Sequence, residues 1–502
     1  FKQKTAYEIM PSLVGSEMCI RDRGRLVDPL ARKEIDVLLN GQPTNRQFLI
    51  ENLHIIQDRY NQLPVSLLAA LAQKMSLSQA EVFEVASFYH HFKVIKEEEQ
   101  PLPKLTVRIC DGIACEMSGA TNLFRELSKQ ENTNFNVVYA PCVGACNSAP
   151  VAVVGQRQIP LSNAKKVMRA ITLGEITPVM PTYENLNTYR SLGGYEKLIE
   201  CKANILSREH VLDQLEKSGL RGMGGAGFPV FRKWKFLEGK TKPRAIVVNA
   251  DEGEPGTFKD RDILTLNPHQ LIEGMAIASY ATGSTVAYNY IRGEYHQPWV
   301  RFENALKEAY EAGYLGQDIR GTGVSFDLYS QRGAGAYICG EETGLLESLE
   351  GKKGMPRFKP PFPAQVGAFG KPTTVNNTET LASLPPIIRR GPDWFNNLGQ
   401  ESSGGSKIFS VSGHVQRPGN YEITLGTPFS ELLNLAGGLF EERSLKAVIP
   451  GGSSMPVMPA EAILSCEMGY DQLQQAGSMI GSGGVIVMDN TTSMVEVLER
   501  IA

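Results

Sequence analysis

The sequence predicts a multidomain α/β protein, and three observations support this fold class. The chain has 502 residues, of which 42% are apolar and 21% charged, a globular composition. Residues 24–98 follow a helical hydrophobic pattern, and a β-α-β order begins near residue 105. Two glycine-rich loops then occur in a second α/β region after residue 196. At roughly 100–200 residues per domain, we expect several domains.

Composition excludes several classes of protein. A net charge of −3 argues against broad attraction to nucleic acid or membrane surfaces. No apolar run reaches the roughly 20 residues that a membrane span requires. Eight cysteines are too few for a disulfide scaffold, which favours a reducing compartment. We therefore predict a cytoplasmic protein that binds no nucleic acid and does not insert directly into a membrane.

Residues 1–23 and residues 24–98 differ in their sequence patterns. Residues 1–23 contain SLVGSEMCIRDR, which resembles translated sequencing adapter, and we expect this segment, with Cys19, to be non-native. Residues 24–98 show helical periodicity and a capping box at 78–81, and they predict a helical bundle. His90 and His91 close this region. The pair could ligate a metal, but surface or packing histidines are the simpler interpretation.

Residues 103–175 alternate between strand and helix patterns. We predict strands at 105–110, 135–140 and 151–154, and helices at 120–129 and 163–171. The β-α-β start implies parallel strands joined by a right-handed crossover, which brings the ends of the first two strands to one edge of the sheet. Four cysteines, spaced C-x4-C and C-x3-C, fall at that edge: Cys110, Cys115, Cys142 and Cys146.

Three roles are possible for these four thiols: disulfide bonds, a zinc site or an iron–sulfur cluster. Disulfides are disfavoured by the predicted compartment. Structural zinc prefers tight knuckles that enclose a single ion tetrahedrally. A [2Fe–2S] cluster needs four thiolates on permissive loops, and the small residues Ala114, Gly144 and Ala145 leave backbone amides free to approach the sulfurs. We favour the [2Fe–2S] cluster and keep zinc as the alternative.

After a linker at 176–195, a larger α/β domain spans 196–400, and its first loop is rich in glycine. Gly222, Gly224 and Gly227 match G-x-G-x-x-G. The preceding segment reads as a helix, whereas a dinucleotide fold requires a strand there. We therefore predict that this loop brings backbone close to a phosphate in a different fold, with a plain tight turn as the alternative.

An acidic strand end comes next. The predicted strand 244–248 leads into Asp251, Glu252 and Glu254, where ligands of open α/β sheets bind. Hydrogen bonds to the ribose or ring nitrogens of a nucleotide would explain crowded carboxylates. The alternatives are a solvated acidic loop and, because no histidine accompanies the acids, less favourably a metal site.

A second glycine loop, 332–344, stands between a predicted strand at 324–329 and a helix at 345–349, the order that an anion site requires. Cys339 inside it is interpreted as a packing residue. Lys359, in the proline-rich segment beyond, either meets a phosphate or ribose or is solvated. The stretch 373–377 offers amide side chains to a flavin edge.

Residues 405–490 predict a small β-grasp-like domain. Its strands surround the turn 417–420, and we expect Thr427 and Pro428 at the N-cap and first position of a helix. Cys466 receives no role.

These modules resemble a known family. Residues 24–175 resemble the thioredoxin-like [2Fe–2S] subunit of respiratory complex I, the 24 kDa type, and residues 196–502 its 51 kDa-type NADH- and FMN-binding subunit with an SLBB-like β-grasp domain. The fusion is similar to the beta subunit of NAD-dependent, molybdenum- or tungsten-containing formate dehydrogenases. The supporting segments are VDPLARKEI, LIENLHIIQDRY, SLSQAEVFEVASFYHHF, NADEGEPGTFKD and RGAGAYICGEE.

The resemblance implies cofactors and residue roles. FMN would lie near Gly222, Gly224, Gly225, Lys233, Asn249, Asp251, Tyr337, Gly340, Asn376 and Asn377. NAD(H) would stack over it, bounded by Phe228, Phe236, Lys359 and Phe362, with Glu254 and Glu342 tuning the site as its catalytic residues. The family often has Arg where this chain has Met223, so that side chain's phosphate contact would be lost.

One departure from the family is large. The family continues into a C-x2-C-x2-C segment that binds a [4Fe–4S] cluster, whereas this chain stops at Ala502 without it. Residues 491–502 would begin that helical domain, and we expect a truncated fragment that passes electrons onward poorly.

The implied function is that of a diaphorase subunit, which passes electrons between NAD(H), FMN and iron–sulfur clusters. Its expected partner is a molybdopterin-type formate dehydrogenase alpha subunit. Complex I and NAD-reducing hydrogenases use the same modules and stay as alternatives. A non-enzymatic alternative is a zinc-loaded, nucleotide-sensing scaffold.

Overall fold

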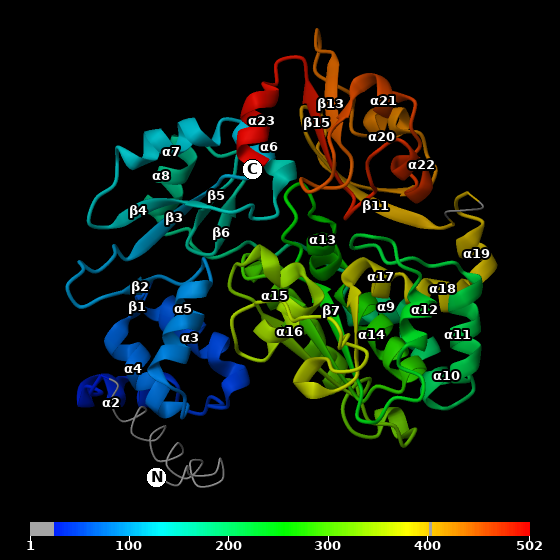
Figure 1. Ribbon diagram of the computed structural model, residues 1–502, viewed down its shortest axis with the longest axis horizontal. Coiled ribbons are helices and arrows are strands. Elements are labelled where there is room, and N and C mark those ends of the chain that lie inside the picture. Colours follow the sequence, from blue (N-terminus) through cyan, green and yellow to red (C-terminus); the bar gives the residue numbers. More distant parts are fainter. Residues whose placement is uncertain (1–24, 401–403, 502) are drawn as a thin grey trace, which may run out of the picture.

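The computed structural model describes residues 25–400 and 404–501. The predicted non-native segment 1–23, with Cys19, lies outside these residues. Figure 1 shows a mixed α/β architecture in which an N-terminal helical bundle, two α/β bodies and a C-terminal β-rich domain follow one another along the chain. This confirms the predicted fold class. None of the helices in the described ranges is both long and apolar enough to cross a membrane.

The N-terminal bundle consists of four helices and two short strands. They are α2 (Pro29–Leu38), α3 (Leu49–Tyr60), β1 (Leu63–Pro64), α4 (Val65–Lys74), α5 (Gln79–Phe88) and β2 (Val94–Ile95), with β1 parallel to β2. The predicted capping box forms at the start of α5. Ser78 Oγ accepts the backbone N–H of Glu81 at 3.2 Å, and the backbone N–H of Ser78 donates to Glu81 Oε2 at 2.9 Å.

The next body is a four-stranded sheet in the order β4-β3-β5-β6. Its elements are β3 (Leu105–Cys110), α6 (Ile113–Met117), α7 (Ala120–Ser128), β4 (Phe135–Ala140), β5 (Ala152–Val154), β6 (Arg157–Ile159) and α8 (Ala164–Leu173). Strands β3 and β4 are parallel and paired from Leu105–Phe135 to Cys110–Ala140. The predicted crossover is therefore present, and it sets the loops after both strands at one edge.

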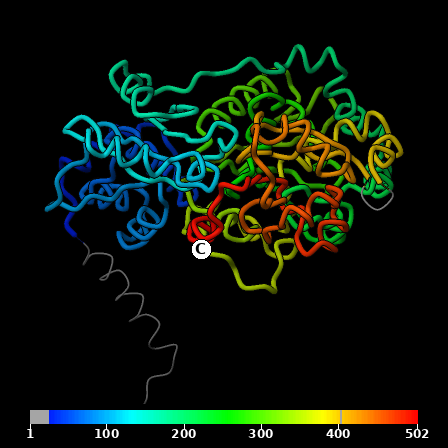
Figure 2. The backbone as a smooth tube through the Cα atoms, turned by 90° about the horizontal axis from the view of Figure 1, so that it is seen from above, coloured from blue at the N-terminus to red at the C-terminus, as the bar shows by residue number. Residues whose placement is uncertain are grey.

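The segment 174–185 connects the two α/β bodies along the outside of the molecule, as Figure 2 shows from above. It lies against α15 (His296–Glu311), where Arg301 donates to the carbonyl of Pro181 and Tyr183 donates to Glu308 at 2.8 Å. Two short helices follow, α9 (Leu186–Ser191) and α10 (Glu196–Lys202).

The large α/β body is built on a fully parallel sheet in the order β10-β7-β8-β9. Its strands are β7 (Ala245–Ala250), β8 (Val286–Ile291), β9 (Asp327–Arg332) and β10 (Thr373–Asn377). Its other helices are α11 (Arg208–Lys217), α12 (Val230–Lys235), α13 (Lys259–Leu266), α14 (Pro268–Thr282), α16 (Glu342–Leu349), α17 (Thr378–Ala382), α18 (Leu384–Arg390) and α19 (Pro392–Asn396). Parallel strands end at one edge, so the loops after β7 and β10 meet there.

The helical bundle covers one face of this parallel sheet. Alternation along β7 sends Ile246 and Val248 into the core formed with α14, whereas Val247 joins the core of the bundle helices. Tyr290 of β8 and Leu345 of α16 also belong to that shared core. The bundle is thus one layer of the large domain, although about 150 residues separate the two in sequence.

The third strand of the sheet begins later than predicted. The sequence places a strand at 324–329, but β9 runs from Asp327 to Arg332. Residues 324–326 pair instead with the loop before them, because Phe326 bridges Gly316 and the carbonyl of Val324 accepts the N–H of Ile319.

The C-terminal domain contains a five-stranded sheet in the order β12-β11-β15-β13-β14. Its elements are β11 (Ser406–Gly413), β12 (Gly419–Thr424), α20 (Phe429–Leu435), β13 (Leu445–Ile449), β14 (Met458–Pro459), α21 (Ala460–Leu464), α22 (Tyr470–Gln475), β15 (Gly484–Asp489) and α23 (Met494–Ile501). The predicted cap at Thr427 is wrong by one residue. Pro428 is the N-cap, and Thr427 Oγ1 donates to the carbonyl of Thr424.

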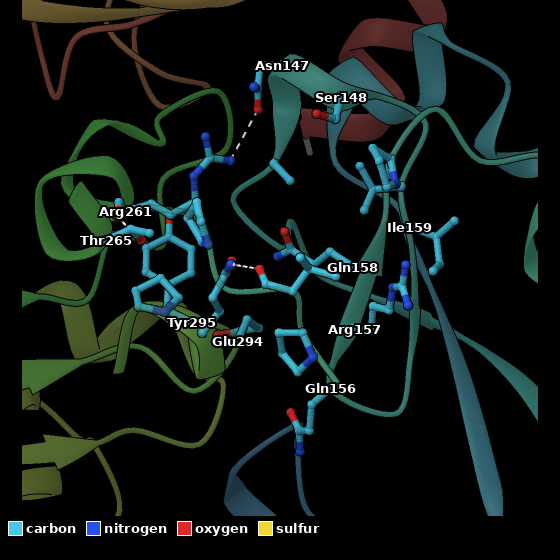
Figure 3. A pocket seen from close by; sticks show the side chains of 18 of the residues that line it. Asn147, Ser148, Gln156, Arg157, Gln158, Ile159, Arg261, Thr265, Glu294 and Tyr295 are labelled. Atoms are coloured by element: carbon cyan, nitrogen blue, oxygen red, sulfur yellow. Dashed lines mark hydrogen bonds between the residues drawn. The ribbon is translucent and has the colours of Figure 1, made fainter. Parts of the chain in front are cut away.

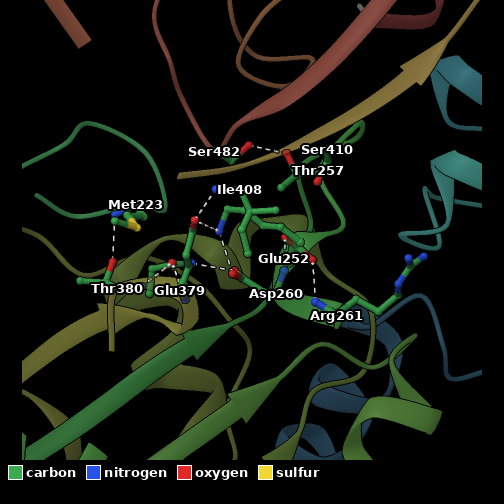
Figure 4. A network of polar contacts seen from close by, with 12 residues as sticks. Met223, Glu252, Thr257, Asp260, Arg261, Glu379, Thr380, Ile408, Ser410 and Ser482 are labelled. Carbon is green, nitrogen blue, oxygen red and sulfur yellow. Dashed lines mark hydrogen bonds and ion pairs between the residues drawn. The ribbon is translucent and has the colours of Figure 1, made fainter. Parts of the chain in front are cut away.

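A buried charge network joins the C-terminal domain to the large domain (Figure 4). Lys407 of β11 reaches Glu379 Oε2 at 3.2 Å, and the backbone N–H of Ile408 donates to Glu379 Oε1 at 2.7 Å. Lys259, which is fully buried, pairs with Glu379 at 2.9 Å and with Asp260 at 2.7 Å. Glu379 is therefore the anion shared by two buried lysines from different domains.

Replacing this shared anion should be costly. We expect Glu379→Gln to destabilise the large domain by about 3–5 kcal/mol, because it removes the charge that compensates two buried ammonium groups. For a domain of this size, that corresponds to a decrease of roughly 6–20 °C in the unfolding midpoint. Thermal unfolding followed by circular dichroism measures it, with the exposed Glu431→Gln as control. Equal midpoints for both variants would contradict the role of Glu379.

Candidate functional site

A cavity of about 520 Å³ opens at the carboxyl edge of the parallel sheet, beside the ends of β7 and β10. Every predicted binding or catalytic residue lines it except two: Gly222, Gly224, Gly225, Phe228, Lys233, Asn249, Asp251, Glu254, Tyr337, Gly340, Glu342, Lys359, Asn376 and Asn377. Phe236 and Phe362 lie outside this lining and are about half exposed. Phe236 packs against Phe228, with 6.2 Å between ring centroids.

The first glycine loop forms one wall of the cavity. It connects helices α11 and α12, as expected for a fold other than the dinucleotide fold. A Cβ on Gly225 would enter open space, whereas one on Gly224 would press on Asn377 at 2.8 Å. Gly227 has a φ of +65° and packs under Tyr470 of the C-terminal domain. The loop therefore presents bare backbone to the cavity on one side and is fixed from behind on the other.

Met223 does not face the cavity. Its side chain is 2% exposed and belongs to the core of the large domain. Its backbone is held on both sides, because Thr380 Oγ1 accepts its N–H at 2.9 Å and Lys407 Nζ donates to its carbonyl at 2.6 Å. The loop is thus positioned by the same buried lysine that bridges the two domains.

Lys233 and Asp251 give the cavity features that fit an anionic, aromatic cofactor. Lys233 Nζ donates one N–H to the carbonyl of Val375 at 2.5 Å, which leaves two for a ligand. Asp251 Oδ2 is buried without a hydrogen-bond partner among the described residues. Burial raises the pKa of Asp251 to about 8, so its carboxyl is neutral at pH 7 and can donate.

The acidic side chains that follow β7 point in two directions. Glu254 faces the C-terminal domain, where Ser454 N–H donates to its Oε1 at 2.7 Å and Tyr337 OH donates to its Oε2 at 2.5 Å. Glu252 turns toward the thiol-bearing body, accepting Tyr295 OH at 2.8 Å and the N–H of Asp260 at 2.9 Å. The crowded carboxylates therefore do not converge on one metal ion.

The second glycine loop does not leave a free helix N-terminus, contrary to the sequence prediction. Glu341 occupies that position and accepts the N–H groups of Thr343 at 2.7 Å and Gly344 at 2.8 Å. An anion there would meet a carboxylate. Lys359 Nζ lies 2.9 Å from Glu341 and 2.7 Å from Glu342, so this lysine and the predicted catalytic Glu342 form one ion pair at the cavity rim.

The amide side chains are already bonded within the protein. Asn249 Nδ2 donates to the carbonyl of Gly340 at 2.8 Å. Asn376 Oδ1 accepts Trp234 Nε1–H at 3.1 Å. Asn377 Nδ2 donates to Asp260 at 2.6 Å, while its Oδ1 caps α17. Their direct hydrogen bonding to a flavin stays a prediction, and their observed role is to fix the cavity wall.

Several lining residues are absent from the sequence prediction: Thr257, Lys259, Asp260, Thr380 and Ser482. Lys259 and Asp260 belong to the segment NADEGEPGTFKD, which was the available signal. Ser482 comes from the C-terminal domain, more than two hundred residues from Thr257, whose hydroxyl it contacts. No local sequence pattern predicts that a residue of another domain lines the cavity.

The four predicted cysteines converge at the edge of the β3–β4 pair. All are buried, with 1–4% exposure, and none forms a disulfide. Cys142 and Cys146 sulfurs lie 3.5 Å apart, and a Cβ on Gly112 would meet the sulfurs of Cys142 at 3.4 Å and Cys110 at 3.5 Å. The crossover therefore assembles four thiols in one buried site, as predicted.

Their spacing favours a cluster over a single ion. A tetrahedral zinc with Zn–S bonds of about 2.3 Å holds its thiolates roughly 3.8 Å apart. Among the described residues, the sole group of three or more potential ligand atoms that all lie within 4.8 Å of one another contains no cysteine. Cys142 and Cys146 are thus as close as two thiolates on one ion, but no three of the four sulfurs all lie within 4.8 Å of one another, an arrangement that suits a binuclear iron–sulfur cluster.

A buried joint connects the thiol site to the cavity. Arg292 donates to the carbonyl of Cys142 and, at 2.6 Å, to the carbonyl of Glu252. Tyr295 packs on Gly144, where a Cβ would overlap its ring, and Arg261 donates to the carbonyl of Gly144 at 2.9 Å. The loop between Cys142 and Cys146 is therefore held against the strand end that lines the cavity.

A larger cavity of about 690 Å³ lies elsewhere, between β6, α8 and α15 (Figure 3). Arg261 donates to Asn147 across its edge at 3.2 Å. None of the predicted site residues lines it. Size alone would therefore select the wrong site, and the convergence of glycine backbone, Lys233 and Asp251 identifies the smaller one.

Gly144 offers a test of the thiol site. We expect Gly144→Ala to lower iron from about two atoms per chain and to abolish the cluster's visible absorbance, because the methyl group overlaps Tyr295 and displaces the loop. Gly119→Ala is the matched control, since Gly119 also has a positive φ, +89° against +67° at Gly144, but no atom lies within 4 Å of the new Cβ. Equal iron loss in both variants would contradict this account.

Three family models match the chain. A thioredoxin-like [2Fe-2S] ferredoxin model matches residues 35–173, a Nuo51 FMN-binding domain model 215–386, and an SLBB domain model 408–458. They confirm the predicted FMN and [2Fe–2S] cofactors, which fit the cavity and the four thiols described above. The SLBB match likewise confirms the β-grasp-like domain.

Curated relatives are highly similar over more than half of the chain. The chain is 51% identical over 298 residues to an NADH-quinone oxidoreductase subunit of Rickettsia bellii (strain OSU 85-389), covering 59% of this chain and 72% of that protein. It is 50% identical over 324 residues to an NADH-quinone oxidoreductase subunit of Rhizobium meliloti (strain 1021), covering 64% and 76%.

A solved structure resembles nearly the whole chain. It is that of an NAD+-reducing [NiFe]-hydrogenase in the air-oxidized state, with a TM-score of 0.77 and 30% identity over 92% of this chain and 80% of that one. The H2-reduced state gives 0.78 and 31%, over 91% and 79%. The chain belongs to the family of NADH-quinone oxidoreductase subunits that are built on the Nuo51 FMN-binding domain, with a thioredoxin-like [2Fe–2S] domain joined ahead of its FMN-binding and SLBB domains.

Proposed function

We propose that the chain is a diaphorase subunit that exchanges electrons between NAD(H) and its [2Fe–2S] cluster through FMN bound in the 520 Å³ cavity. The observation that carries the proposal is the buried joint of Arg292, which bonds both the cysteine loop and the strand end lining the cavity. FMN, when bound, supplies the conversion between two-electron hydride transfer and single-electron transfer.

The protein's own groups hold the flavin. The bare backbone of the first glycine loop and the ammonium of Lys233 receive its phosphate, since both face the cavity and Lys233 has spare donors. The neutral carboxyl of Asp251 donates to the cofactor. Asn249 and Asn377 keep the walls in place through their bonds to Gly340 and Asp260.

Other residues receive the nicotinamide nucleotide. Phe228 and Phe236 pair at the entrance and offer aromatic faces for stacking, and the half-exposed Phe362 offers a third. Glu254, Glu342 and Lys359 stand at the rim as hydrogen-bonding groups, each already held by a protein partner. They orient the nucleotide and form no covalent bond to it.

The partner that we propose is a molybdopterin-type formate dehydrogenase alpha subunit, which would deliver electrons from formate for the reduction of NAD+. The fused [2Fe–2S] and FMN modules and the sequence segments that resemble the formate dehydrogenase beta subunit support this choice. Co-expression with such an alpha subunit, encoded in the same gene neighbourhood, should give formate-dependent NADH formation. A hydrogenase or quinone-reductase subunit in that neighbourhood, with no activity on formate, would assign the chain to one of the alternative complexes.

The non-enzymatic alternative is directly testable. The protein purified anaerobically should be coloured, contain about one FMN and two irons per chain, and reduce ferricyanide with NADH. A colourless protein that contains zinc and lacks this activity would instead support the scaffold.

The raised pKa of Asp251 predicts how flavin binding depends on pH. Below pH 8 the carboxyl is neutral and donates; above it, a buried carboxylate faces a phosphate-bearing ligand. The FMN dissociation constant should therefore be flat between about pH 7 and 8, where the FMN phosphate is already fully ionised, and rise about tenfold per unit above pH 8. Fluorescence titration measures it, and Asp251→Asn should remove the dependence. The same rise in Asp251→Asn would contradict this assignment.

A further inference from the structure

A second candidate ligand set lies outside the flavin cavity and the cysteine site. One imidazole nitrogen of His54, one of His91 and a carboxylate oxygen of Asp58 all lie within 4.8 Å of one another. His54 and Asp58 are four residues apart on α3, so they share one face of the helix. His91 comes from the loop that follows α5.

The histidine nitrogens are arranged as ligands commonly are. His54 is 6% exposed, and its Nε2–H donates to the carbonyl of Gly333 at 2.9 Å, which leaves the lone pair on Nδ1. Metal-bound histidines usually donate their other N–H in this way. His54 Nδ1 and His91 Nε2 are both buried and have no hydrogen-bond partner in the part of the chain that the structure describes.

The distances between these side chains leave space for a bound ion between them. His91 Nε2 lies 4.0 Å from Asp58 Oδ1, which is too long for a direct hydrogen bond. Bonds of about 2.0–2.1 Å to a tetrahedral ion would set such ligands roughly 3.3–3.5 Å apart, a contraction that side-chain rotation can supply. Burial lowers the pKa of both imidazoles, so each is neutral near pH 7.

We propose that His54, Asp58 and His91 bind a divalent transition metal of the zinc class. Two nitrogens and one carboxylate oxygen suit such an ion and leave a fourth position open. Asp58 is 45% exposed, and His91 lines a cavity of about 640 Å³, so the ion has a path of entry.

The metal would fasten three parts of the fold at one point. The helical bundle contributes His54 and Asp58, and the glycine loop of the large domain holds His54 through Gly333. The turn of the thioredoxin-like domain holds Asp58, because Gln156 Nε2 donates to it at 3.4 Å. This role goes beyond electron transfer between NAD(H) and the cluster.

Opposing charges set a limit on affinity. The guanidinium groups of Arg332 and Arg108 lie near the two histidines, and their positive charges disfavour a bound metal ion. The carboxylates of Asp58 and Glu294 partly offset these charges. We therefore expect weaker binding than at a closed structural zinc site with four thiolates.

The test uses the intact protein with its flavin and cluster bound, after dialysis against EDTA. Isothermal titration with Zn²⁺ should give about one site per chain. We expect His91→Ala and Asp58→Asn to weaken that site by at least tenfold. The matched control is His90→Ala, since His90 is the adjacent, exposed histidine outside the ligand set; its affinity should be unchanged.

Thermal unfolding provides the second readout. Zn²⁺ should raise the unfolding midpoint of the wild type and of His90→Ala, but not those of His91→Ala and Asp58→Asn. A wild type that binds no Zn²⁺, or a site whose affinity is unchanged in both ligand variants, overturns the proposal. Because Asp58 is exposed, its variant keeps the test valid if His91→Ala does not fold.

Discussion

The arrangement of the whole molecule depends on one buried joint, in which Arg292 and Tyr295 tie the cysteine loop to the end of β7. Arg292 donates to the carbonyls of Cys142 and Glu252, and Tyr295 fills the space over Gly144 while donating to Glu252. Electron transfer slows steeply with distance, so two redox sites are useful together only when their separation is fixed. Charge-assisted hydrogen bonds in a buried setting provide such a fixed separation.

The same principle recurs on the other side of the cavity. Lys407 crosses from the SLBB domain to hold the carbonyl of Met223, and Ser454 of that domain holds Glu254. The cavity is therefore shaped by the C-terminal domain together with the large domain. The helical bundle adds stiffness from behind, because it shares its core with β7 and β8.

Much of this could be predicted from sequence where a local pattern carried the signal. The C-x4-C and C-x3-C spacing, together with the β-α-β order, located the thiol site, and the glycine loop and acidic strand end located the cavity. The features that the sequence did not predict depend on contacts between segments that lie far apart in the chain. Glu341 occupies the helix N-terminus that the sequence pattern assigns to an anion, and Ser482 enters the cavity from another domain. No local sequence pattern indicates that His91 lies beside His54 and Asp58 of α3.

The most direct test of the central claim asks whether NADH reduces the cluster by way of the flavin site. The oxidised protein is mixed with excess NADH under anaerobic conditions. NADH delivers two electrons at the flavin site, and if that site communicates with the cluster, one of them should reach the cluster and produce the electron paramagnetic resonance signal of its reduced form. Protein from which FMN has been removed should give that signal with dithionite but not with NADH. Loss of the flavin absorbance with NADH, without any cluster signal, would contradict the account.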